Sequence, residues 1–218
     1  MLHIKTTHYE NINNTYYKKI YENILNDIEI IEDFFTNIND FIFEDDYLSP
    51  SMYLLIRNIS KIYSLIEYLK EKLDNWYENV SKESRIRVSV INNNLSLESI
   101  IKLDNNYIIN WNNSKIDLPI YDLVKLYKNT YDKVDFSNLL DIYLSKYPLN
   151  KNEIELLLIL LSIPDGVTFG DDEYKNVCKV NKLYDYIYKT DDLVSKYYSK
   201  YKKEENNDFD KEQNSIPS

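Results

Sequence analysis

Apolar side chains recur every three or four residues along two long stretches of this chain, and this spacing predicts two amphipathic helices. The first stretch covers about residues 8–42 and the second about residues 50–80. Ser49 and Pro50 mark the start of the second, because Ser can cap a helix and Pro suits its first position. The short link between the two stretches favours an antiparallel helix pair.

The pattern changes after residue 84 from helical spacing to short β-type segments. Residues 85–91 alternate and are rich in β-branched side chains, which predicts a strand. Three asparagines at 92–94 indicate a loop. Residues 99–103 and 107–111 are two further strand-like runs, and 104–106 is a turn segment between them. This region therefore predicts a strand, an Asn-rich loop and a small hairpin.

The remaining chain is predicted to be helical over about residues 119–130, 135–146 and 151–162, with a last helix that ends near residue 202. Asn150 and Glu153 have the spacing of a capping box at the start of the third of these helices. From Glu204 the chain is polar and charged, which predicts a disordered tail over 204–218. The predicted fold class is mainly α with a small β-hairpin (α+β).

The composition excludes several classes of function. The 218 residues include two glycines, Gly166 and Gly170, so no glycine-rich phosphate loop can form. The net charge of −10 argues against nucleic acid and against anionic membranes as partners. No apolar run is long enough to span a bilayer. We therefore expect neither a nucleic-acid partner nor a membrane partner.

Cysteine and histidine are too scarce for most metal or nucleophilic sites. A single cysteine, Cys178, allows no internal disulfide and no Cys-rich zinc site, and it favours a cytoplasmic location. The two histidines, His3 and His8, lie in a terminal segment, where solvated side chains are expected. No Ser-His-Asp arrangement is expected, and no metal site.

The segment WNNSKIDLPIYDLVKLY, residues 111–127, together with the order of elements before it, resembles the C-terminal lobe of choline-kinase-like and aminoglycoside-phosphotransferase-like proteins. The nearest branch is the spore-coat kinase-like group of Firmicutes. The resemblance divides the chain into an N-terminal helical extension (1–48), a kinase-like C-terminal lobe (49–203) and the tail (204–218). It also implies that the nucleotide-binding N-terminal lobe is missing.

The resemblance further implies that the catalytic positions are replaced. Related kinases carry a His-Gly-Asp-x-x-x-x-Asn loop, and Asn94 stands at the place of its Asp while Ser99 stands at the place of its Asn. Asn110 stands where a second metal-binding Asp is expected. Asp122 matches a structural Asp that opens a helix and hydrogen-bonds the catalytic-loop backbone. We therefore expect Asp122 to contact the loop at 92–98.

The resemblance thus predicts a pseudokinase that acts as an interaction or structural protein with a role in sporulation and binds neither ATP nor Mg²⁺. Two alternatives stay open: an atypical small-molecule phosphotransferase, and a helical scaffold unrelated to kinases. On the first helix Tyr17, Tyr21 and Phe34 lie off the main apolar stripe. They predict either that this helix folds back on the lobe or that it contacts a protein partner or a second copy.

Overall fold

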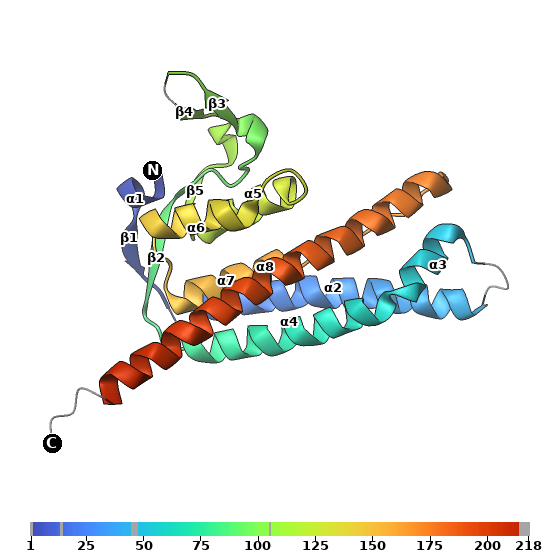
Figure 1. The fold of residues 1–218 in the computed structure, drawn as a ribbon, viewed down its shortest axis with the longest axis horizontal. Coiled ribbons are helices and arrows are strands. Elements are labelled where there is room, and N and C mark those ends of the chain that lie inside the picture. Colours follow the sequence, from blue (N-terminus) through green and yellow to red (C-terminus); the bar gives the residue numbers. More distant parts are fainter. Residues whose placement is uncertain (1, 14, 45–47, 105, 214–218) are drawn as a thin grey trace.

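The computed structural model describes residues 2–13, 15–44, 48–104 and 106–213, and the side chains of 40–44 and 202–213 are left out of this description. The chain is mainly helical with small antiparallel sheets (Figure 1), so the predicted class is confirmed. The helices are α1 (Leu2–Thr6), α2 (Tyr16–Glu44), α3 (Pro50–Arg57), α4 (Ile59–Val80), α5 (Ile120–Thr130), α6 (Phe136–Lys146), α7 (Lys151–Ser162) and α8 (Glu173–Gln213). The strands are β1 (His8–Asn11), β2 (Arg85–Ile91), β3 (Ile100–Lys102), β4 (Asn106–Ile108) and β5 (Lys115–Asp117).

The long helices pack against one another around a shared hydrophobic core. α2 and α4 run antiparallel side by side, α4 also packs on α7, and α8 packs on α3 and α7 (Figure 1). The buried stripe of α4 includes Leu69, Leu73 and Trp76, and α2 contributes Ile28 and Phe35. Fully burying each of these side chains contributes about 1.5–3 kcal/mol. The predicted antiparallel pair therefore shares a buried apolar interface.

The first predicted helix begins later than its sequence pattern indicates. Residues 8–11 form β1, which pairs with β2 from His8 opposite Val88 to Asn11 opposite Arg85. β5 pairs with the other edge of β2, which gives the sheet order β1-β2-β5. The apolar residues of this strand happen to continue the helical 3–4 spacing. The segment is a strand because it pairs with β2, which is distant in the sequence. The expectation of helix over 8–13 was therefore wrong.

The second predicted helix is divided at Asn58 into α3 and α4. The Ser49 hydroxyl accepts the Met52 N–H at 3.4 Å and Pro50 occupies the first turn, so the predicted start signal is confirmed. The Asn58 N–H bonds the Leu55 carbonyl at 3.2 Å, which ends α3, and its side chain bonds Leu54 O. The break turns α3 toward α8.

The later helices follow their sequence signals closely, and the capping box of Asn150 and Glu153 is present with both reciprocal bonds at 2.8 Å. α8 differs, because it continues to Gln213 and does not end near 202. Lys, Glu and Gln are strong helix formers, and extending an existing helix is far easier than nucleating one. The predicted tail thus begins within α8, and residues 214–218 lie outside the described part.

Residues 2–44 belong to the same body as the rest of the chain. α1 lies against β2, β1 extends the sheet, and α2 packs on α4. These three elements therefore pack on elements that follow residue 48. Within the described residues, no helix is both long enough and apolar enough to cross a bilayer.

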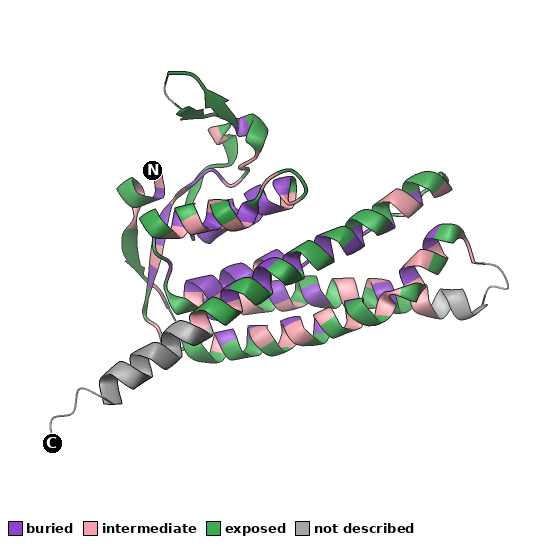
Figure 2. Ribbon diagram, in the orientation of Figure 1, coloured by how far each residue is buried: buried purple, intermediate pink, exposed green. Residues whose placement is uncertain are grey.

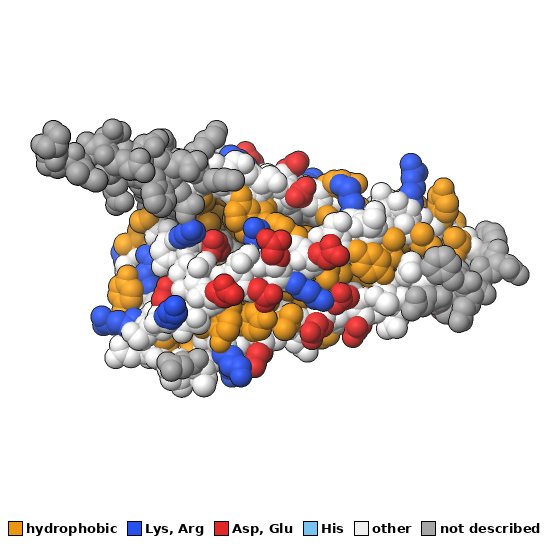
Figure 3. All heavy atoms as spheres, turned by 90° about the horizontal axis from the view of Figure 1, so that it is seen from below, with side chains coloured by type: hydrophobic (Ala, Val, Ile, Leu, Met, Phe, Trp, Pro, Cys, Tyr) orange, Lys and Arg blue, Asp and Glu red, His pale blue; other side chains and the backbone are white. Residues whose placement is uncertain are grey.

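Charged side chains are mixed with apolar ones on the surface. On the face shown in Figure 3, acidic side chains lie along the middle, between patches of hydrophobic side chains, and the basic side chains are scattered. This distribution agrees with the net charge of −10.

Candidate functional site

Asp122, in the first turn of α5, accepts hydrogen bonds from the backbone of the Asn-rich loop that follows β2. The Asp122 carboxylate is 3% exposed and accepts the Asn92 N–H at 2.9 Å and the Asn93 N–H at 2.7 Å. Hydrogen bonds to a charged group are stronger than neutral ones, and buried amides need partners. The contact predicted for Asp122 is therefore present, and it fixes the position of the loop relative to α5.

His3 completes the surroundings of this carboxylate. The His3 Nε2 lies 3.2 Å from Asp122 Oδ2, and its Nδ1 lies 2.8 Å from the Tyr143 hydroxyl. The two ring nitrogens of His3 thus each have a polar partner, one on α5 and one on α6. Burial raises the pKa of Tyr143, which keeps that phenol protonated.

The expectation that both histidines are solvated was wrong for His3. Its side chain is buried at 7% exposure, whereas His8 lies exposed beside Glu10, 3.1 Å away. The burial depends on α5 and α6, more than 100 residues along the chain, so no local sequence signal reveals it.

We predict that His3→Ala lowers the free energy of unfolding by about 2 kcal/mol, because it leaves part of a buried carboxylate and a buried phenol without a partner. The matched variant His8→Ala removes an exposed side chain and should change stability by less than about 0.5 kcal/mol. Urea unfolding of both variants checks this. Equal losses would contradict the assigned role of His3.

The loop is also tied to the end of the hairpin. The Asn92 side-chain amide donates to the carbonyls of Asn110 at 3.1 Å and Ile109 at 3.4 Å, and its oxygen accepts the Asn94 N–H at 3.2 Å. Asn93 and Asn110 both have left-handed backbone, with φ of 59° and 62°. Asparagine tolerates this conformation better than most residues, so the abundant asparagines suit the backbone of this site.

The structure brings Asn94, Ser99 and Asn110, the three positions that the resemblance singles out, to one place around this network. Ser99 is 1% exposed, and its hydroxyl lies 3.1 Å from the Ser96 hydroxyl and 3.5 Å from Asn94 O. The Asn94 N–H donates to the side-chain oxygen of Asn92, and the Asn110 carbonyl accepts from its side-chain amide. Asn94, Ser99 and Asn110 offer neutral amides and a hydroxyl, and none of them is a carboxylate.

The chemical capacity of this arrangement is small. Asparagine has no basic oxygen at neutral pH that could accept a proton from a substrate hydroxyl. Mg²⁺ prefers charged oxygen ligands in octahedral geometry. In the described part of the chain, no group of three or more His, Cys, Asp or Glu side chains could hold a metal ion.

Tyr17, Tyr21 and Phe34 lie against the core and do not form a free surface. Tyr17 is buried, and its hydroxyl donates to Glu83 at 2.9 Å. The Tyr21 hydroxyl donates to Asp74 on α4 at 2.7 Å, and this bond, with partial burial, raises the pKa of Tyr21 to about 12. Phe34 packs on the core beside Phe35. The first of the two predicted outcomes for this helix, folding back on the lobe, is thus the one observed.

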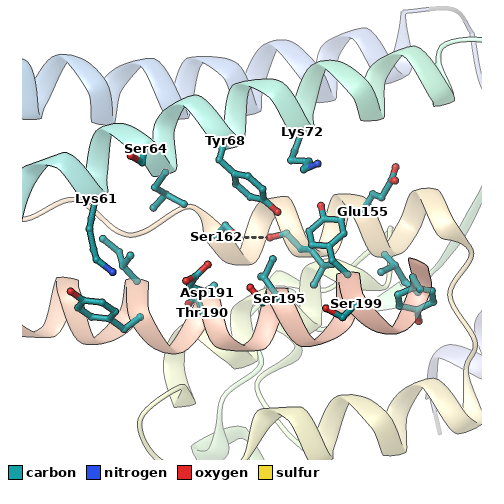
Figure 4. Close-up of a pocket in the computed structure, with 18 of the residues that line it drawn as sticks. Lys61, Ser64, Tyr68, Lys72, Glu155, Ser162, Thr190, Asp191, Ser195 and Ser199 are labelled. Atoms are coloured by element: carbon teal, nitrogen blue, oxygen red, sulfur yellow. Dashed lines mark hydrogen bonds between the residues drawn. The ribbon is translucent and has the colours of Figure 1, made fainter. Parts of the chain in front are cut away.

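A groove that the sequence did not predict lies between α4 and α8, over α7 (Figure 4). It is a groove of about 1120 Å³. Its lining includes the apolar side chains of Leu158 on α7 and of Ile187 and Val194 on α8. Ring contacts run across it from α4 to α8: the Lys61 ammonium lies 3.9 Å from the ring centre of Tyr188, and the rings of Tyr68 and Tyr198 meet edge to face at 6.5 Å. The Lys72 ammonium also lies 5.4 Å from the ring centre of Tyr198.

The groove is lined by several hydroxyls, by lysines and by two carboxylates, Glu155 and Asp191. Ser64 and Ser195 lie on opposite walls, and Glu155 lies near Lys72 at one end (Figure 4). Glu155 Oε2 is buried without a hydrogen-bond partner among the described residues. No histidine lines the groove, so a Ser–His nucleophile pair is absent from these lining residues.

Comparisons of this chain with protein-family models, with curated proteins and with solved structures found no match in any of the three.

Proposed function

We propose that this protein is a non-catalytic, kinase-like scaffold, a pseudokinase that acts through protein contacts. The single observation that carries the proposal is the pair of hydrogen bonds that the Asp122 carboxylate accepts from the backbone N–H groups of Asn92 and Asn93. It is the contact that the resemblance requires, at the residue and the loop that the resemblance names.

The side chains around the loop support the non-catalytic half of the proposal. The loop keeps its anchoring carboxylate, while Asn94 and Asn110 carry amides where the kinase reaction needs acids. Loss of a general base alone costs about 10²–10⁴ in rate, and loss of the metal ligands removes the charge that positions the phosphates. The anchor stabilises the fold, so it is retained even where the reaction is not.

The single cysteine, Cys178, supports a cytoplasmic location for this scaffold, and the resemblance adds an association with spores to the same proposal. Fractionation of sporulating cells of the source organism tests that part separately. Recovery of the protein in vegetative cells alone would contradict the spore association and leave the proposal of a pseudokinase unaffected.

We predict that 1 mM Mg-ATP does not raise the melting temperature. A site with a dissociation constant of about 10 µM would add about 2.7 kcal/mol at this concentration and raise the melting temperature by several degrees. Thermal unfolding with and without Mg-ATP measures this. A rise of several degrees that Asn110→Ala removes would instead favour the atypical phosphotransferase.

A further inference from the structure

The groove between α4 and α8 contains a carboxylate oxygen without a partner. Glu155, on α7, lines the groove at the end where Lys72 lies (Figure 4). Among the described residues, its Oε2 is buried and accepts no hydrogen bond. Buried polar atoms normally have a hydrogen-bond partner. The side chain as a whole is only partly buried, and rotation about its last torsion turns this oxygen toward the groove, where a ligand can donate to it.

The neighbouring lysine does not supply the missing donor. The Lys72 ammonium lies 5.5 Å and 5.4 Å from the ring centres of Tyr68 and Tyr198, and its ion pair is with Glu71 at 4.0 Å. Burial raises the pKa of Tyr198 most, and the nearby charge of Glu155 adds to the rise. Lys72 and Glu155 thus both lie close to Tyr198 and do not pair with each other.

The length and lining of the groove fit a short extended peptide. The groove runs along α4 between Lys61 and Lys72, a stretch of helix about 16 Å long, which is about the span of five extended residues (Figure 4). Leu158, Ile187 and Val194 give it apolar contacts for side chains. Its volume of about 1120 Å³ exceeds what a single amino acid needs.

Hydroxyl groups follow both walls of the groove. Ser60 and Ser64 lie one turn apart on α4, and Ser195 and Ser199 lie one turn apart on α8. All four side chains are exposed. A peptide backbone carries donors and acceptors along its whole length, whereas an aliphatic chain carries none. Two rows of hydroxyls therefore favour a peptide over a lipid tail.

We infer that this groove binds the amino-terminal end of an apolar peptide, with the peptide's ammonium group on the Glu155 carboxylate. The ammonium supplies both the hydrogen bond and the opposite charge that Glu155 lacks, and charge-assisted bonds of this kind are strong. The peptide's apolar side chains contact Leu158, Ile187 and Val194, and its backbone bonds the serine hydroxyls. The net charge of −10 also attracts the positive end of a chain.

This inference names a partner for the proposed scaffold, but it does not depend on kinase ancestry. The two fail separately, because the peptide is measured at the groove and Mg-ATP at the Asn-rich loop.

Isothermal titration calorimetry with the peptide Leu-Ser-Leu-Ser-Leu, amidated at its carboxyl end, tests the inference. In an extended chain its three leucines share one face. The wild-type protein is expected to bind it saturably below about 1 mM. Acetylation of the peptide, which removes the ammonium, and Glu155→Gln, which keeps the side-chain shape, should each weaken binding about 10-fold or more. Together they should weaken it no further, because they remove the same contact.

Glu71→Gln is the matched control, because it removes an exposed carboxylate at the same end of α4 that does not line the groove, and it should leave binding unchanged. Circular dichroism establishes that each variant is folded. The absence of saturable binding to the wild type would overturn the inference. So would equal affinity for the acetylated peptide, an unchanged affinity in Glu155→Gln, or binding of decylamine as tight as that of the peptide, which would indicate a site for aliphatic cations.

Discussion

Asp122→Ala is expected to lower the free energy of unfolding by about 3–4 kcal/mol, because it removes the acceptor for two backbone amides and for His3 in a buried place. The loop at 92–94 then loses its anchor to α5, and the buried Asn92 amide loses its acceptor. Urea unfolding of the purified variant measures the loss.

Asp122→Asn is the informative companion, because it keeps one carbonyl oxygen of nearly the same shape. Its loss should be smaller, about 2 kcal/mol, since one of the two loop amides keeps an acceptor. Asp191→Ala removes an exposed carboxylate on α8 and should change stability by less than about 0.5 kcal/mol. If Asp122→Ala costs no more than Asp191→Ala, the anchoring role is wrong.

Glu153→Ala is expected to lower the free energy of unfolding by about 3–5 kcal/mol, because it leaves the partly buried Arg87 guanidinium without its counter-charge. Arg87 Nε donates to Glu153 Oε1 at 2.9 Å and its Nη2 donates to Oε2. Burial alone would lower the pKa of Arg87, but the bonds and charge of Glu153 outweigh it and raise the pKa. The same substitution also removes the capping box with Asn150.

A double-mutant cycle with Arg87→Met separates these contributions. The paired variant Arg87→Met, Glu153→Ala should be more stable than the sum of the two single losses predicts, because it no longer contains an unpaired charge. Thermal or urea unfolding of the four proteins gives the coupling. Additive losses would mean that the capping box, and not the ion pair, is what Glu153 contributes.

The sequence predicted the elements whose signals are local. The strand at 85–91, the hairpin after it, the capped helix at 151–162 and the Ser49 start signal all depend on residues near one another in the chain. The anchoring contact of Asp122 was accessible as well, through the motif around Pro119 and the loop it faces.

The sequence did not predict features that depend on distant contacts. β1 looked helical because Tyr9 and Ile12 fit the apolar spacing of α2, and only β2 makes that segment a strand. β5 is short and mostly exposed, so it lacks the alternation that marks a half-buried strand. The burial of His3 and the groove between α4 and α8 both result from how complete helices pack, which residue spacing does not encode.

The most direct test of the account uses ¹H–¹⁵N NMR spectra for two measurements. Hydrogen exchange of the Asn92 and Asn93 amides tests the anchor that Asp122 provides. Titration with Mg-ATP to about 1 mM, where a site with a dissociation constant of about 10 µM would be saturated, tests whether nucleotide binds. We predict slow exchange for the Asn92 and Asn93 amides, because both are bonded to Asp122, and fast exchange in Asp122→Ala. We predict no saturable shift of the Asn94 or Asn110 amides with Mg-ATP. Fast exchange of Asn92 and Asn93 in the wild type, or a saturable Mg²⁺-dependent shift at Asn94 and Asn110, would contradict the account.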